Sequence, residues 1–177
     1  DFTFTSLVNE KETIQTAKSV LDIVEINHEL KEVTPIELKT GGEGFMKSYY
    51  RYKRWLQGSM YHDALESLNY TKDGITYKVN PTKFIYADTN LFYKPMIYTM
   101  SEADILGARE GIDYVVSFYD NEFETLFKSK VDTPKYKGYK QLAAELEWHE
   151  KNDLWDYSYD VYQNNFEAPI DIFIPHF

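Results

Sequence analysis

Two acidic residues and one lysine in the first third of the sequence have a spacing that could bring them together. Glu37 and Lys39 are two apart in an alternating stretch, so on a strand their side chains point to the same face. Asp22 is the single acid on an otherwise apolar face of an earlier alternating stretch, residues 19–27. If the two strands pair, Asp22 comes close to Glu37 and Lys39. Two carboxylates and one ammonium would then lie together at the edge of a core.

Such a cluster is costly to bury unless something binds there. A hard divalent cation with oxygen ligands, such as Mg²⁺ or Mn²⁺, would satisfy both carboxylates. Lys39 would then position a water or stabilise negative charge on a phosphate. The alternative is an exposed, charged strand face with one salt bridge, and the three residues taken alone favour that alternative.

The stretch Phe45–Leu68 is expected to form a helix that follows the second strand. Gln57 and Tyr61 are four apart in it and therefore lie on one helix face. Four cationic side chains belong to the same predicted helix: Lys47, Arg51, Lys53 and Arg54. Such side chains are most often solvated, but their place beside the carboxylates favours contact with phosphate as a second interpretation.

Together these residues resemble the PD-(D/E)XK nuclease superfamily. Asp22 followed by E-L-K, Glu37 to Lys39, looks like the core motif of that superfamily. The Q-x-x-x-Y spacing of Gln57 and Tyr61 is similar to an element of its RecB-like and Cas4-like branch, which includes phage exonucleases. The resemblance covers roughly residues 19–98 and makes the metal-site interpretation the favoured one.

The resemblance implies a restriction-endonuclease-like α/β fold, with a mixed central sheet flanked by helices. It implies a metal-dependent deoxyribonuclease, preferably an exonuclease of phage or bacterial recombination and repair that hydrolyses phosphodiester bonds. By the same resemblance, Asp22 and Glu37 would hold Mg²⁺ or Mn²⁺ together with the carbonyl of Leu38. Lys39 would orient the attacking water.

The resemblance also assigns roles on the helix, where Gln57 and Tyr61 would position the DNA strand. Members of the family often have Gly where this chain has Ser19, and usually carry an upstream helix with a His or Glu that completes the site. The sequence begins at Asp1 without clearly showing such a helix. We therefore expect a processed or truncated chain, and a nuclease fold without activity stays open as an alternative.

With 177 residues the chain fits one domain, residues 1–177, that buries a sizeable core. The nuclease-like core is expected over about residues 13–130, followed by a helical and irregular, aromatic-rich extension over 131–177. The chain has no cysteine, which excludes disulfides and thiolate metal sites and is compatible with a reducing cytosol. It has no apolar run of membrane-spanning length and no signal-peptide pattern, so we expect a cytoplasmic protein without a membrane partner, in the bacterial host if phage-encoded.

The formal net charge of −10 argues against a protein that holds DNA by a broad basic surface. A rival interpretation is therefore a non-catalytic, acidic and aromatic-rich interaction protein, for instance a phage structural or assembly component. Sixteen Tyr and eleven Phe residues support it, and the aromatic C-terminal region would then bind a protein partner. The two interpretations differ over metal binding and DNA cleavage.

The remaining pattern predicts the elements around this stretch. An antiparallel meander is expected to lead into Glu37, from a strand over residues 1–8 and one long or two short strands over Thr13–Asn27. Later strands are expected at Ile75–Val79, Lys83–Ala87 and Pro95–Met100, and helices from the Ser101 cap to about Lys130 and over Gly138–Asn152.

Overall fold

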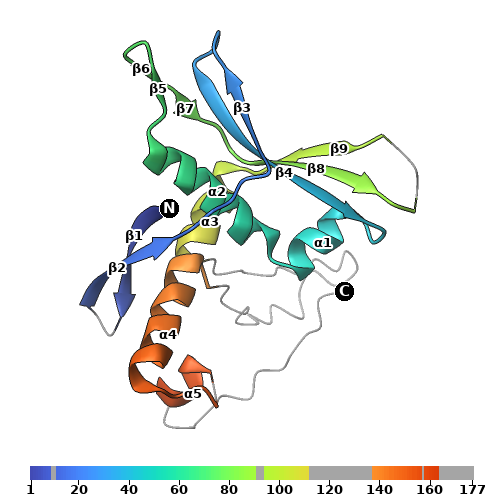
Figure 1. Cartoon of the computed structure of the whole chain (residues 1–177). Helices are drawn as coiled ribbons and strands as arrows, with labels where there is room; N and C mark the ends of the chain where they lie inside the picture. Colours follow the sequence, from blue (N-terminus) through green and yellow to red (C-terminus); the bar gives the residue numbers. More distant parts are fainter. Residues whose placement is uncertain (9–10, 91–93, 112–136, 157, 164–177) are drawn as a thin grey trace, which may run out of the picture.

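The computed structural model describes residues 1–8, 11–90, 94–111, 137–156 and 158–163 (Figure 1). These residues form a mixed α/β structure with a mixed central sheet. The described strands are β1 (Phe2–Val8), β2 (Lys11–Ala17), β3 (Ile23–Asn27), β4 (Glu32–Gly41), β5 (Thr71–Lys72), β6 (Ile75–Thr76), β7 (Lys78–Val79), β8 (Lys83–Asp88) and β9 (Met96–Thr99). The described helices are α1 (Phe45–Arg51), α2 (Arg54–Leu68), α3 (Glu102–Glu110), α4 (Tyr139–Asn152) and α5 (Tyr159–Gln163).

The central sheet has the strand order β3-β4-β8-β9, and β7 pairs with the beginning of β4. β4 and β8 are parallel, whereas the outer pairs β3–β4 and β8–β9 are antiparallel. A mixed central sheet is therefore confirmed. The predicted strand Ile75–Val79 is divided at Tyr77, because β6 pairs with β5 while β7 pairs with β4.

The expected meander into Glu37 is divided between two sheets. β1 and β2 form a separate two-stranded sheet, seen apart from the central sheet in Figure 1. The stretch Thr13–Asn27 contains two short strands, and Asp22 lies at a bend directly before β3 rather than within a strand. The pairing of β3 with β4 begins only at Ile23 and Ile36. Beyond that pair, the backbone N–H of Leu38 donates a hydrogen bond to the Asp22 carboxylate (3.0 Å) rather than to a carbonyl of β3.

The predicted helix Phe45–Leu68 is two helices, because Lys53 adopts a left-handed conformation (φ 48°) between α1 and α2. Both helices pack against β8. The buried core cluster consists mainly of aromatic residues: Phe45, Tyr49, Trp55, Phe84, Tyr86, Met100, Ile105 and Ala108. Gly58 permits the close approach of α2, since a Cβ atom there would lie 3.0 Å from Cζ of Phe84.

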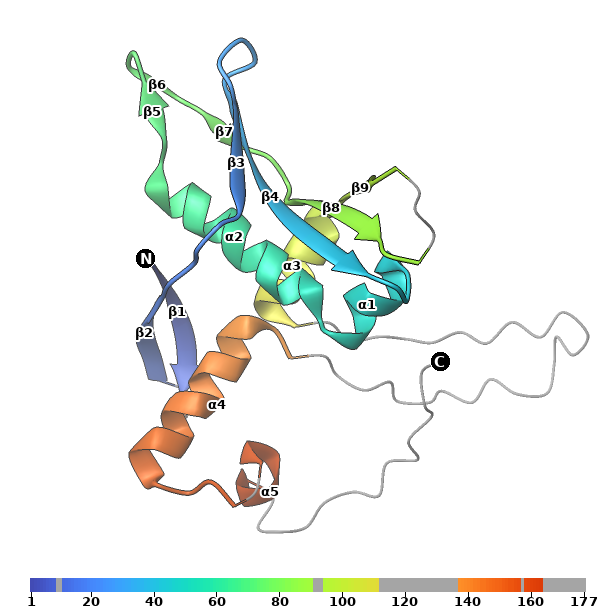
Figure 2. The ribbon, with the colours of Figure 1, turned by 45° about the vertical axis from the view of Figure 1, so that its right-hand side comes forward.

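The C-terminal described helices extend this helical layer. α3 begins at Ser101 with a capping box, in which Ser101 Oγ accepts from the Asp104 N–H (3.0 Å). The continuation predicted to Lys130 lies outside the described residues from position 112 onwards. α4 lies along β1, as Figures 1 and 2 both show, and the rings of Phe4 and Tyr139 meet edge to face at 5.0 Å between centroids. β1 and β2 thus pack against α4, while residues 131–136, 157 and 164–177 of the predicted C-terminal extension lie outside the described residues.

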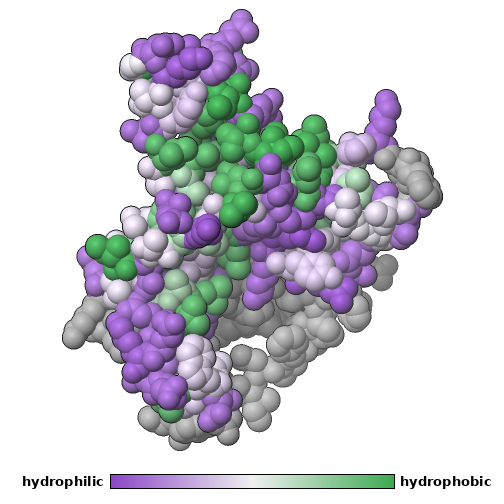
Figure 3. Space-filling model, viewed as in Figure 1, coloured by the Kyte–Doolittle hydropathy of each residue, from purple (hydrophilic) through white to green (hydrophobic). Residues whose placement is uncertain are grey.

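The other face of the central sheet is apolar and exposed. Ile23, Leu38 and Ile97 are 41%, 48% and 63% exposed. In the sheet Ile23 pairs with Ile36, and Ile85 pairs with Leu38 on one side and with Ile97 on the other. Figure 3 shows the hydrophobic side chains gathered over this sheet. Among the described residues, no helix has the length and hydrophobicity needed to cross a membrane.

Candidate functional site

Glu37 is the centre of the candidate site. It lies on the face of β4 that packs towards α2, and it is only 3% exposed. Its Oε1 accepts a hydrogen bond from Gln57 Nε2 (2.9 Å) and forms an ion pair with Lys39 Nζ. Its second oxygen, Oε2, is buried and has no hydrogen-bond partner. A buried carboxylate oxygen without a donor or cation is energetically unfavourable, so a ligand bound at Oε2 of Glu37 would be stabilising.

Asp22 reaches the same edge of β4 from the bend before β3. Its Oδ2 accepts the backbone N–H of Leu38, the residue between Glu37 and Lys39. Unlike Glu37, Asp22 is exposed to solvent. Its carboxylate is therefore accessible from solvent beside the strand residue that separates Glu37 from Lys39.

Gln57 and Tyr61 close the site from α2. The side-chain amide of Gln57 donates both to Glu37 and to the Tyr61 hydroxyl (2.8 Å), so it joins β4 to one face of the helix. Burial raises the pKa of Tyr61, and the negative charges of Glu37 and Asp22 raise it further, although the Gln57 hydrogen bond acts in the opposite direction. The phenol of Tyr61 therefore stays protonated. The charges of Glu37 and Asp22 both act on this hydroxyl group.

The expected grouping of residues from β4 and α2 is thus present in the structure. Glu37, Lys39, Gln57 and Tyr61 are linked by direct contacts, and Asp22 adjoins them through the Leu38 backbone. Of the four cations of the predicted helix, Lys47 and Arg51 lie on α1, Lys53 lies between the two helices, and Arg54 begins α2.

The donor set fits a hard divalent cation. Two carboxylates and a strand backbone offer only oxygen ligands, which Mg²⁺ and Mn²⁺ prefer. The unpartnered Oε2 of Glu37 is a free ligand position, while Lys39 and Gln57 hold the other oxygen of that carboxylate. Asp22 and Glu37 could hold such an ion, and the family resemblance adds the carbonyl of Leu38.

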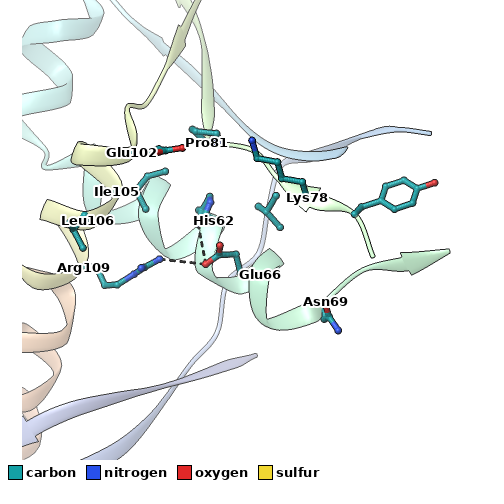
Figure 4. Close-up of a pocket in the computed structure, with 11 residues that line it drawn as sticks. His62, Glu66, Asn69, Lys78, Pro81, Glu102, Ile105, Leu106 and Arg109 are labelled. Atoms are coloured by element: carbon teal, nitrogen blue, oxygen red, sulfur yellow. Dashed lines mark ion pairs between the residues drawn. The ribbon is translucent and has the colours of Figure 1, made fainter. Parts of the chain in front are cut away.

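A second polar cluster lies farther along α2, outside the residues predicted to form the site. Ligand atoms of His62, Asp63 and Glu66 lie within 4.8 Å of one another. Figure 4 shows His62 and Glu66 beside Arg109 of α3, on the wall of a hollow of about 510 Å³. The Arg109 guanidinium donates to Asp63 through Nε (2.9 Å) and lies 3.6 Å from Glu66 Oε2.

This second cluster already contains its countercharge. Burial alone would raise the pKa of Asp63, but hydrogen bonds from His62, Arg109 and Tyr139 outweigh it and lower that pKa to about 2. The network ties α2 to α3 and α4 rather than leaving a ligand position open. The partners that Asp63 takes from other helices could not be predicted from spacing, because Asp63 is 46 residues from Arg109 and 76 from Tyr139.

No family model, curated protein or solved structure matches this chain.

Proposed function

We propose that the protein is a metal-dependent DNA nuclease of the PD-(D/E)XK type. The observation that carries the proposal is the buried Glu37 carboxylate, which has one oxygen held by Lys39 and Gln57 and the other without a partner. An ordinary exposed salt bridge on a strand would not bury the acid or recruit a helix amide to orient it. A site prepared to take a cation accounts for both features.

The residues of the site would divide the work of phosphodiester hydrolysis. Asp22 and Glu37, with the Leu38 carbonyl, would hold Mg²⁺ or Mn²⁺, which when bound stabilises charge on a phosphate and lowers the pKa of a bound water. Lys39 would orient the attacking water and stabilise the developing negative charge, because its ammonium is held at the Glu37 carboxylate.

The helix residues would position the substrate. Gln57 fixes the orientation of Glu37, and Tyr61 supports Gln57 as a neutral phenol. The cations of α1 and early α2 would contact DNA phosphates and compensate locally for the overall negative charge. The resemblance favours an exonuclease of phage or bacterial recombination and repair, which would act in the bacterial cytoplasm.

A digestion assay tests this function. The full chain is incubated with linear duplex DNA, single-stranded DNA and closed circular plasmid, in Mg²⁺ or Mn²⁺ and in EDTA. We expect loss of linear DNA that requires the metal and spares the closed circle. Lys39→Ala should abolish it, whereas Lys151→Ala, an exposed lysine of α4 whose side chain is 61% exposed, should cleave like the parent. Cleavage that persists in Lys39→Ala would refute the assignment.

The rival function is a non-catalytic interaction protein, and the apolar outer sheet face of Ile23, Leu38 and Ile97 is the observation in its favour. Such a protein would neither cleave DNA nor be stabilised by millimolar Mg²⁺. An inactive nuclease fold would still bind the metal at Glu37 without cleaving DNA. Cleavage and metal binding, measured together, separate the three cases.

A further inference from the structure

Helix α1 and the residues up to the start of α2 have a composition unlike that of the whole chain. Residues 45–54 read FMKSYYRYKR and contain four cations and no acid, in a protein of net charge −10. They also contain three tyrosines, of which Tyr49 is buried in the core while Tyr50 and Tyr52 are each 56% exposed. Burial does not explain the two exposed rings, and the overall charge does not explain the local excess of cations.

The exposed ring of Tyr52 organises the cations around it. The guanidinium carbon of Arg54 lies 5.1 Å from the centre of this ring, and that of Arg51 lies 5.5 Å from it. Cation–π contacts of this kind hold planar guanidinium groups in place at the surface. Arg54 is fixed further by donation from Nε to Ser48 Oγ (2.8 Å), and Arg51 pairs with Glu43 (3.1 Å).

This surface lies directly beside the candidate site. Arg54 and Gln57 are three apart on α2, so they share one helix face and are separated along its axis by about 4.5 Å. Gln57 in turn contacts Glu37. A strand bound across Tyr52 and Arg54 would therefore have its next phosphates near the carboxylates.

We propose that Arg51, Tyr52 and Arg54 form a binding surface for single-stranded DNA that delivers an unpaired strand to the Glu37 site. Unpaired bases stack on exposed tyrosine rings and guanidinium planes, and the guanidinium groups contact the phosphates between them. Paired bases in a duplex keep their faces stacked on one another and cannot use such rings. The inference rests on the proposed nuclease function and adds the form of its substrate and the residues that hold it.

Binding is measured by fluorescence anisotropy in EDTA, where no cleavage occurs, with a labelled oligonucleotide as the single strand or annealed to its complement. We expect tighter binding of the single strand. Tyr52→Ala should weaken it by about 5- to 140-fold, the range for loss of one stacked base, while Tyr52→Phe keeps the ring and the affinity. In Arg54→Ala, the plot of the logarithm of the binding constant against the logarithm of salt concentration should become shallower by about 0.7, the value for one phosphate contact on a single strand.

The matched control is Trp155→Ala, which removes another aromatic side chain of similar exposure (54%) in the segment between α4 and α5. It should bind like the parent. Thermal melting checks that each variant folds. Equal binding by Tyr52→Ala and the parent, an equal loss in Trp155→Ala, or a preference for the duplex would overturn the inference.

The two proposals fail separately. Metal-dependent cleavage that needs Lys39, together with single-strand binding indifferent to Tyr52, refutes this surface and leaves the nuclease intact. Single-strand binding that needs Tyr52, without any metal-dependent cleavage, supports the surface and refutes the nuclease.

Discussion

Replacement of Glu37 by Gln tests directly whether the buried carboxylate is a metal ligand. The substitution keeps the shape of the side chain and an oxygen that can accept from Gln57, but it removes the charge and puts an amide nitrogen on a ligand position. Lys39, whose side chain is 17% exposed, can turn to solvent when its partner is neutral. We therefore expect the metal-free variant to fold, with a stability change within about 1–3 kcal/mol, the range for one altered buried hydrogen bond.

The effect of metal on the two proteins should differ much more. An ion present at 100 times its Kd stabilises the folded state by about 2.7 kcal/mol. In a chain of this size, 1 kcal/mol shifts Tm by about 2–4 °C, so the parent should gain about 5–10 °C. Glu37→Gln should lose most of that gain, because the remaining acid, Asp22, is exposed and binds Mg²⁺ weakly when alone.

The assay is a Tm titration with MgCl₂ and MnCl₂ against NaCl of equal ionic strength, because screening alone also stabilises a chain of net charge −10. Glu66→Gln is the matched control, since Glu66 belongs to the His62–Asp63–Glu66 cluster on the same helix. It should keep the full metal-dependent gain. A gain retained in Glu37→Gln but lost in Glu66→Gln would place the metal at the other cluster and refute the reasoning.

Three further outcomes can be checked. Lys39→Ala should lose cleavage by the purified protein while its DNA affinity in EDTA stays close to that of the parent, since Arg51, Tyr52 and Arg54 remain; a parallel loss of affinity would contradict the role given to this lysine. Because the folded pKa of Asp63 (about 2) lies below its ordinary value of 3.8, its network should contribute about 2 kcal/mol above pH 5 that is lost as pH falls towards 2; unfolding by urea at several pH values should show this loss in the parent and not in Asp63→Asn. Gly58→Ala should cost about 1–3 kcal/mol in the same measurement because the new methyl would crowd Met100 and Phe84, and an unchanged midpoint would show that α2 moves freely there.

The pairs of site residues that lie on one strand or on one helix could be predicted, because strand alternation and helix spacing place them on a common face. Glu37 and Lys39 share a face of β4, and Gln57 and Tyr61 share a face of α2, as a period of two and a spacing of four require. The alternation of residues 19–27 placed Asp22 within a strand, and this was wrong. Asp22 lies at a bend and accepts the backbone N–H of Leu38.

Features without a local signal were not predictable. The division of Phe45–Leu68 into two helices occurs at Lys53, in a left-handed conformation that Gly or Asn usually signals and Lys does not. The separation of β1–β2 from the central sheet depends on α4, which offers β1 a different partner. Pairings over such distances in sequence follow from tertiary packing and leave no periodic trace.

The packing of β1–β2 against α4 has a consequence for the order of folding. Hydrogen bonds of the candidate site join residues at most 20 positions apart, as from Asp22 to Leu38 and from Glu37 to Gln57. The contact between Gln15 and Glu147 spans 132 positions. Closing the longer loop costs about 1.7 kcal/mol more in chain entropy than closing a 20-residue one. The strand and helix that carry the site should therefore be in place in the folding transition state, whereas the N-terminal hairpin docks on α4 late and its amide hydrogens exchange first.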